Sequence, residues 1–360
     1  MDNKPIQVSI DGRSLSVPPG IRILDACAAA GVKIPSLCYL PEVSTNASCG
    51  VCVVEVEGAK SLVRSCCQKV APNMAIRTNS ARVQESRRTI VELLLANHPA
   101  DCLACVRNGS CDLQDLAEQL GVRKLPFPRT RKAAPADDGG LAIIRDNDKC
   151  ILCGRCVAVC KETQTVSAID FVGRGIRTRI STFMDRALSG SPCVSCGQCT
   201  LVCPTGALTE RDETDEVFAA LADPDRVVVV QTAPAIRMSL GEALGMKAGS
   251  LVTGKMAAAL RRLGFDKVFD TQFTADLTIM EEGSELLARL TKGGKLPMIT
   301  SCSPGWISFI ETFYPELLPH LSSCKSPQQM FGALAKTYWA QKTGIDPSKI
   351  TVVSIMPSTA

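Results

Sequence analysis

The segment CILCGRCVAVC, residues 150–160, recurs as CVSCGQCTLVC, residues 193–203. Both copies place four cysteines at the spacing Cys-x2-Cys-x2-Cys-x3-Cys, and Pro204 follows the second copy. Two-residue gaps let successive thiolates wrap around one face of a bound metal group, and Gly154 and Gly197 allow the backbone to approach it closely. Zinc sites normally draw their four ligands from two separated pairs, so two unbroken runs argue against the zinc alternative.

This spacing is typical of bacterial two-cluster [4Fe–4S] ferredoxins, in which the fourth cysteine of each run binds the other cluster. The repeat therefore predicts two four-iron clusters with exchanged fourth ligands. The first ligand set is Cys150, Cys153, Cys156 and Cys203, and the second is Cys193, Cys196, Cys199 and Cys160.

Cysteine is also the outlier of the whole composition, at 19 of 360 residues. A chain of this length with 46% hydrophobic residues can form cores without disulfides, so this thiol density indicates metal binding in a reducing, cytoplasmic compartment. The net charge of +4 and the 4% of aromatic residues argue against a nucleic-acid partner. The sequence has no charged-then-apolar leader and no apolar run of about 18 residues, which predicts neither export nor a membrane span.

The N-terminal segment carries another cysteine pattern behind a predicted hairpin and helix. The hairpin is IQVSIDGRSLSVP, residues 6–18, around an Asp-Gly turn, and the helix is ILDACAAAGV, residues 23–32. The layout is that of plant-type [2Fe–2S] ferredoxins, although the first gap is longer than their x4. A zinc site is the alternative, and Cys67 competes with Cys66 as fourth ligand. The preferred ligands are Cys38, Cys49, Cys52 and Cys66.

A third group reads His98-x3-Cys102-x2-Cys105-x5-Cys111, with one of the two histidines of the chain at ligand spacing from three cysteines. It predicts a four-iron cluster in which imidazole replaces one thiolate, with zinc again the alternative. Four clusters then need sixteen ligands, which fifteen cysteines and His98 supply. The cysteines left over are Cys27, Cys67, Cys302 and Cys324, of which Cys27 is predicted to pack in a core.

From residue 226 the pattern becomes α/β, and it predicts a parallel sheet with right-handed crossovers. Four strands are expected, at residues 226–234, 267–271, 297–301 and 350–356. The expected helices are residues 254–265, 279–290 and 328–342.

The order of these modules resembles the large [FeFe]-hydrogenases, and the front half also resembles the iron–sulfur subunit of respiratory NADH dehydrogenase. In the back half, residues 252–282, TSCSPGW at 300–306 and residues 325–338 resemble the hydrogenase catalytic domain. The resemblance implies a modular α+β chain: a β-grasp [2Fe–2S] ferredoxin domain, a one-His/three-Cys [4Fe–4S] segment, a two-[4Fe–4S] ferredoxin domain and a truncated α/β hydrogenase-like lobe with a parallel sheet. The expected bounds are residues 1–80, 81–121, 140–215 and 222–360.

The chain departs from the hydrogenases at the cysteines that hold their active-site cluster. Ser303 stands where the family has the second cysteine of a paired-cysteine loop, and Cys302 matches its proton-transfer cysteine. Ser358 stands in place of the cysteine of a Met-Pro-Cys motif, and the other two family ligands would follow Ala360. Since serine oxygen is a poor ligand for iron that favours thiolate, we expect no active-site cluster (no H-cluster) and no catalytic residues on this chain.

No Gly-x-Gly-x-x-Gly motif follows a strand and no Walker-type loop is present, so the chain is not expected to bind nicotinamide or flavin. The resemblance implies an electron-transfer subunit of an NAD(P)H/ferredoxin oxidoreductase, most specifically an electron-bifurcating transhydrogenase. The implied partners are an FMN- and NAD(H)-binding diaphorase-like flavoprotein, a small [2Fe–2S] subunit, ferredoxin and an NADP(H)-binding subunit. The alternatives are a subunit of an NAD(P)-linked [FeFe]-hydrogenase with the rest of the catalytic domain on another chain, an iron–sulfur sensor or assembly protein, and other NAD(P)-linked complexes.

Overall fold

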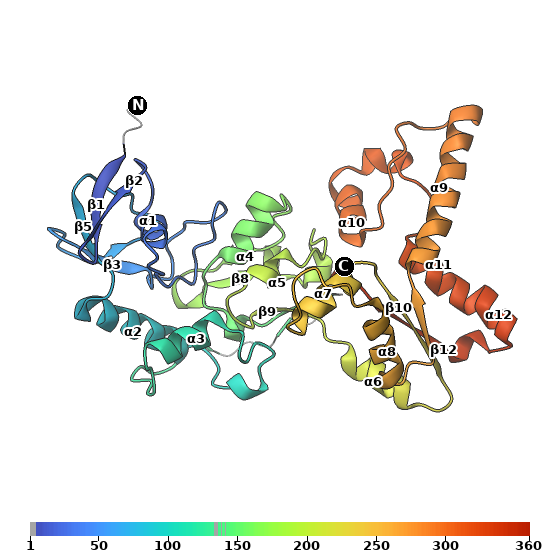
Figure 1. Cartoon of the computed structure of the whole chain (residues 1–360), viewed down its shortest axis with the longest axis horizontal. Coiled ribbons are helices and arrows are strands. Elements are labelled where there is room, and N and C mark those ends of the chain that lie inside the picture. Colours follow the sequence, from blue (N-terminus) through green and yellow to red (C-terminus); the bar gives the residue numbers. More distant parts are fainter. Residues whose placement is uncertain (1–4, 133–135, 138, 141) are drawn as a thin grey trace. The chain divides into compact units, whose positions relative to one another are not determined.

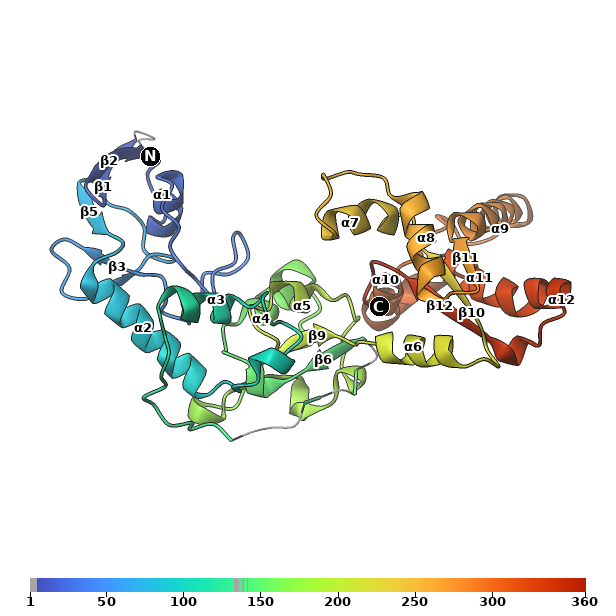
Figure 2. The same ribbon diagram turned by 60° about the horizontal axis from the view of Figure 1, so that its bottom comes forward.

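The computed structural model describes residues 5–132, 136–137, 139–140 and 142–360. The chain forms two compact units, coloured blue to yellow-green and yellow to red in Figure 1 and Figure 2. The first comprises Met1–Cys193 and Gly197–Glu210, and the second comprises Val194–Cys196 and Arg211–Ala360. Of the expected domains, 1–80 includes residues 1–4 and 140–215 includes residue 141, which lie outside the described residues.

The predicted N-terminal hairpin is confirmed. Strands β1 (Ile6–Ile10) and β2 (Arg13–Val17) pair antiparallel from Ile6↔Val17 to Ile10↔Arg13. The two turn residues, Asp11 and Gly12, have positive φ angles of 48° and 81°, which an Asp-Gly pair tolerates.

A five-stranded mixed sheet, in the order β2-β1-β5-β3-β4, is the frame of the N-terminal part, and β1 pairs parallel with β5. Helix α1 (Ile23–Ala29) packs on it and buries Ile23 and Cys27 completely, so the prediction that Cys27 is a core residue is confirmed. The helix ends before the predicted Val32, because Gly31 turns the chain with a φ of 77°. The remaining strands are β3 (Val53–Val56), β4 (Val63–Arg64) and β5 (Met74–Arg77).

Short elements carry the rest of the first unit. Ser80 caps the long helix α2 by accepting a hydrogen bond from the backbone N–H of Val83. Two small antiparallel ladders, β6 with β9 and β7 with β8, flank the repeated cysteine runs. The bounds are α2 (Ala81–Ala96), α3 (Asp112–Gln119), β6 (Ile143–Arg145), α4 (Arg155–Ala158), β7 (Asp170–Val172), β8 (Arg179–Ser181), α5 (Gln198–Val202) and β9 (Leu208–Glu210).

The second unit is built on a parallel sheet in the order β11-β10-β12, as the strand–helix alternation predicts. Alternate residues of the central strand face opposite sides. Val228 and Val230 pack in a core with Met256 and Leu260 of α8, whereas Val229 packs with Phe331 of α11. Helices therefore cover both faces, as Figure 1 shows. The strands are β10 (Val227–Thr232), β11 (Lys267–Asp270) and β12 (Ile350–Ile355).

The helices of the second unit agree with the prediction in position, and two of them extend further. The predicted helix 279–290 is the C-terminal part of the longer α9, and 328–342 is a helical run that passes through a π-helical turn at Ala335–Trp339. The bounds are α6 (Thr214–Ala222), α7 (Ile236–Ala243), α8 (Thr253–Leu263), α9 (Gln272–Lys292), α10 (Pro304–Phe313), α11 (Pro327–Leu334) and α12 (Ala340–Thr343).

The predicted strand at residues 297–301 is wrong. Only Ile299 pairs there, in a single parallel bridge with Leu321, and it joins neither edge of the sheet. Pro297 lacks a backbone N–H and cannot contribute to a ladder at the start of the segment. Within the described part of the chain the sheet thus has three strands rather than four. We also find no helix, among the residues described, with the length and apolar character needed to cross a bilayer.

Candidate metal centres

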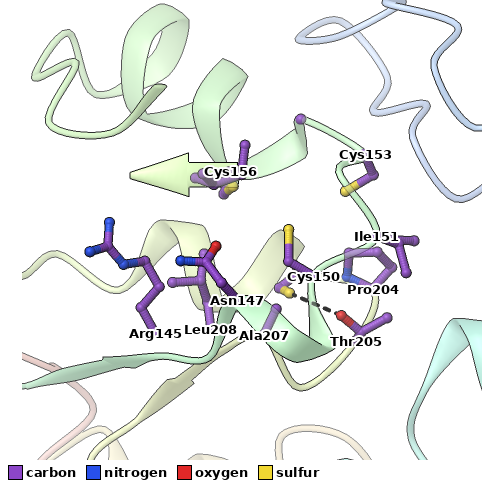
Figure 3. A pocket seen from close by; sticks show the side chains of 13 residues that line it. Arg145, Asn147, Cys150, Ile151, Cys153, Cys156, Pro204, Thr205, Ala207 and Leu208 are labelled. Atoms are coloured by element: carbon purple, nitrogen blue, oxygen red, sulfur yellow. Dashed lines mark hydrogen bonds between the residues drawn. The ribbon is translucent and has the colours of Figure 1, made fainter. Parts of the chain in front are cut away.

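Four thiols of the repeated runs line one pocket. Cys150, Cys153 and Cys156 come from the first run, and Cys203 comes from the end of the second, so the structure pairs these four as the crossed-ligand prediction requires. Figure 3 shows Cys150 pointing up into the space below Cys153 and Cys156. Cys203 Sγ lies 3.8 Å from Oγ1 of Thr205, the contact drawn as a dashed line.

Burial favours the protonated form of the three thiols from the first run. Desolvation raises the pKa of Cys153 to about 12, raises that of Cys150, and raises that of Cys156 well above the usual thiol value. Bound iron would have to displace these protons, because the thiolate is the ligand form. Four inward-facing sulfur atoms in an apolar pocket fit an iron–sulfur cluster, whose thiolates bind separate iron corners.

The two runs share one backbone geometry. Leu152 and Ser195, each two residues after the first cysteine, have φ angles of 57° and 56°. Gly154 and Gly197, two residues further on, have φ angles of 77° and 70° and precede helices α4 and α5. The paired left-handed residues curl each loop so that its cysteines face inward. Glycine predicts one residue of each pair, but nothing in the identity of leucine or serine predicts the other.

The residues of the second predicted ligand set, Cys160, Cys193, Cys196 and Cys199, are divided between the two compact units. Cys160, Cys193 and Cys199 are partly buried and pack against the core that contains Ile143 and Ile180. Cys160 lies in a π-helical turn, Val159–Thr163, and its sulfur accepts a hydrogen bond from the backbone N–H of Ala168 at 3.3 Å. The fourth member, Cys196, belongs to the segment Val194–Cys196 of the second unit.

The N-terminal thiols form a contiguous group. Cys38 is hydrogen-bonded by Cys49 and Cys66, which lowers the pKa of Cys38, and Cys52 is hydrogen-bonded by Cys66, which lowers the pKa of Cys52. The same contacts raise the pKa of Cys49 and Cys66. Cys67 points elsewhere: it is exposed, and its sulfur lies 3.5 Å from the carbonyl oxygen of Arg64. The structure thus places Cys66, and not Cys67, with the other three.

Two contacts join this thiol group to the four-thiol pocket. Ser48, next to Cys49, donates a hydrogen bond to the backbone carbonyl of Cys153 at 3.1 Å, and Nδ2 of Asn46 donates to the same oxygen at 2.9 Å. A Cβ atom at Gly154 would lie 2.6 Å from Asn46 Nδ2, so glycine is required where the two segments meet. The sequence gives no indication of this junction, because its partners lie more than a hundred residues apart.

The His98 group is joined to the segment that carries Cys203. Burial lowers the pKa of His98, which favours the neutral imidazole that binds metals, and its Nδ1 is buried without a hydrogen-bond partner. Cys111 is buried at the start of α3, whereas Cys102 and Cys105 are half-buried. Arg107 donates a 2.8 Å hydrogen bond to the carbonyl of Cys203, which ties this segment to the pocket. Among the described residues, no three His, Cys, Asp or Glu side chains converge as a single bound ion would require.

The residues at the hydrogenase-like positions of the second unit are engaged in local hydrogen bonds. Ser303 caps α10 by accepting from the backbone N–H of Trp306 at 3.4 Å, and the Ser358 hydroxyl accepts from the N–H of Ala360 at 3.3 Å. Cys302 is exposed. Glu285 of α9 accepts a hydrogen bond from the Ser322 hydroxyl at 2.6 Å and pairs with the Arg289 guanidinium.

Comparison with known families assigns each part of the chain. Residues 3–81 match a 2Fe-2S iron-sulfur cluster binding domain, and residues 149–207 match a 4Fe-4S dicluster domain. Residues 87–126 match the NADH-ubiquinone oxidoreductase-G iron-sulfur binding region. Residues 226–360 match the iron only hydrogenase large subunit, C-terminal domain. Across these parts the chain is similar to the large subunit of iron-only hydrogenases.

Individual relatives agree with this assignment. This hydrogenase-like chain is 52% identical over 366 residues to the NADP-reducing hydrogenase subunit HndD of Solidesulfovibrio fructosivorans, covering 99% of the chain and 63% of that protein. It is 39% identical over 355 residues to iron hydrogenase 1 of Clostridium pasteurianum, covering 98% and 62% respectively. The chain therefore spans somewhat less than two thirds of the length of these relatives.

A solved structure supports the fold over part of the chain. A chain of the NAD+-reducing [NiFe]-hydrogenase in the H2-reduced state is similar, with a TM-score of 0.54 and 31% identity, over 57% of this chain and 87% of that one. The family resemblance and the presence of [2Fe–2S] and [4Fe–4S] cluster domains, in the predicted order, are confirmed.

Proposed function

We propose that this chain is the iron–sulfur electron-transfer subunit of a multisubunit, NAD(P)-linked oxidoreductase of the cytoplasm. When bound, the clusters would supply one-electron transfer. The observation that carries the proposal is that three thiol-bearing segments of one compact unit are joined directly at the four-thiol pocket. Ser48 and Asn46 bind the Cys153 carbonyl, and Arg107 binds the Cys203 carbonyl.

The proposed ligand assignment keeps the sixteen predicted residues and the four modules with their predicted bounds. It gives one [2Fe–2S] cluster and three [4Fe–4S] clusters. Contact among the first four thiols supports Cys66 as a [2Fe–2S] ligand, and the buried, unpartnered Nδ1 and lowered pKa support His98 as a ligand. The implied partners are a diaphorase-like flavoprotein that binds FMN and NAD(H), a small [2Fe–2S] subunit, and ferredoxin or an NADP(H)-binding subunit.

Two versions of the complex have specific support. Ser303 and Ser358, with hydroxyls occupied in local hydrogen bonds, favour an electron-bifurcating transhydrogenase without an H-cluster on this chain. The 52% identity to a subunit of an NADP-reducing hydrogenase favours the second version, a hydrogenase complex. Hydrogen evolution by the purified complex with reduced dye distinguishes them: it is expected to be absent in the first version and present in the second.

Iron analysis tests the common part of the proposal. Anaerobically purified protein is expected to contain about 14 iron atoms per chain, from one two-iron and three four-iron clusters. EPR of the reduced protein should resolve both cluster types. Zinc instead of iron at the His98 group, or an iron content near that of the two-cluster domain alone, would contradict the assignment.

A further inference from the structure

Arg145 carries the one permanent charge among the described side chains that line the four-thiol pocket. It ends strand β6 opposite Leu208 of β9, and Leu208 also lines the pocket. Figure 3 shows Arg145 beside Asn147, on the side of the pocket that lies below Cys156. A pocket built to hold an anionic group therefore has a cation in its wall.

The guanidinium is buried and has a donor to spare. Arg145 is 5% exposed, and it cannot shed its proton. Nη2 pairs with Asp137 Oδ2 at 2.8 Å, and Nη1 donates to Ser181 Oγ at 3.3 Å. Its Nε–H finds no acceptor among the described residues, and neither does the buried Oδ1 of Asn147 find a donor. A buried donor without a partner is destabilising, so it calls for a functional explanation.

A purely structural role explains these observations poorly. The segments of Asp137 and Arg145 are already joined by two backbone hydrogen bonds, of 2.7 and 2.9 Å. The side-chain pair adds the desolvation of two charges, and a buried ion pair is often no more stabilising than apolar side chains of similar size. What an apolar side chain could not supply is a fixed positive charge and a free N–H donor on a residue of the pocket wall.

We propose that Arg145, with Asp137 as its counter-ion, sets the reduction potential of the iron–sulfur group held by Cys150, Cys153, Cys156 and Cys203. The inference rests on the proposed function, which assigns that group to the pocket. Reduction adds a negative charge, and a buried cation nearby stabilises the reduced form. Hydrogen bonds to the sulfur atoms act in the same direction, and both raise the potential. Arg145 is a positioning and tuning residue in this scheme, and it is not itself a ligand.

The test is an EPR-monitored redox titration of the full chain with opposite charge changes at the two partners. Arg145→Met leaves Asp137 as an uncompensated negative charge and is expected to lower the midpoint potential of one four-iron signal. Asp137→Asn leaves Arg145 uncompensated and is expected to raise it. Arg145→Lys keeps the charge without the Nε–H, so its shift should be smaller than that of Arg145→Met. Arg88→Met, an arginine bonded to the Leu120 carbonyl and absent from the pocket wall, should shift nothing.

Control measurements separate the two hypotheses. The relevant EPR signal is the one that wild-type protein shows and Cys150→Ser lacks. If wild-type protein shows no such signal, the proposed function itself is wrong, and not the tuning role alone. If the signal is present and its potential is the same in Arg145→Met and Asp137→Asn, or moves in the same direction in both, the tuning role is wrong. Should Arg145→Met not fold, Asp137→Asn conserves size and decides the question by the presence or absence of an upward shift.

Discussion

The hydroxyl of Ser48 donates a 3.1 Å hydrogen bond to the backbone carbonyl of Cys153, and so links two segments of the first unit whose cysteines are assigned to different proposed metal centres. Asn46 donates to the same carbonyl at 2.9 Å. One oxygen atom therefore accepts from two side chains of a single loop, which fixes the distance between the loop and the pocket wall. The rate of electron transfer between two clusters falls steeply as the distance between them grows. A change in the contacts of this carbonyl oxygen is therefore expected to change that rate.

Ser48→Ala is expected to retain all clusters and to weaken the link. It removes the hydrogen bond from the Ser48 hydroxyl to the Cys153 carbonyl, worth about 1 kcal/mol, and leaves that carbonyl bound to Asn46. Electron transfer from the reduced cluster of one centre to the oxidised cluster of the other, followed by rapid freezing and EPR, should become slower. The double change with Asn46→Ala should slow it further. Ser14→Ala, at an exposed strand position, is the control, and equal rates in all three proteins would refute the role of the link.

Gly154→Ala is expected to destabilise the protein and to reduce its iron content. The new Cβ would lie 2.6 Å from Asn46 Nδ2 and 3.0 Å from Phe171, at a φ of 77°. Gly20→Ala is a matched control, because Gly20 has a φ of 80° with open space around it. Backbone strain should cost about 1 kcal/mol at both sites, and the steric clash should add to it only at Gly154. Denaturation of both variants measures the difference, and equal losses would show that the contact can relax.

Cys66→Ser and Cys67→Ser should differ completely in their effect on the [2Fe–2S] centre. Cys66 is fully buried and in contact with Cys38 and Cys52, whereas Cys67 is exposed. Cys66→Ser is expected to abolish the two-iron EPR signal, and Cys67→Ser is expected to leave it unchanged. Loss of the signal in Cys67→Ser alone would reverse the ligand assignment.

Glu285→Gln should destabilise the second unit near neutral pH. The expected loss is about 1 kcal/mol and no larger, because water partly screens this carboxylate. Bonds from Ser322 and Arg289 lower the pKa of Glu285 in the folded state. The stabilisation is therefore present above the unfolded pKa of a glutamate and is lost as the pH falls through the lower, folded pKa. Thermal unfolding from neutral to acidic pH should show the difference from wild type shrinking. Glu281→Gln, at an exposed position on the same helix, should show no comparable effect.

Short sequence patterns predict those parts of the structure that interactions between neighbouring residues determine. The hairpin at Asp11-Gly12 follows from turn chemistry, and the pairing of Cys203 with the first cysteine run follows from the repeat. The segment at Pro297 resembles a strand because it is apolar, yet among the described residues it forms a single bridge, between Ile299 and Leu321, which tertiary packing determines. Arg145 lies in the same pocket wall as Cys203, and Ser48 bonds to Cys153. Both relationships join residues distant in sequence, so no periodicity or motif reveals them.

The contact among Cys38, Cys49, Cys52 and Cys66 has a chemical consequence for the protein before iron arrives. Thiols that already share hydrogen bonds need little movement to form a disulfide, and the lowered pKa of Cys38 and Cys52 increases the thiolate fraction that attacks. Iron-free protein in contact with oxidants would therefore close this site by cross-linking its own ligands. In iron-free protein, oxidation of these thiols would compete with iron binding, and a thiol reductant would reverse it.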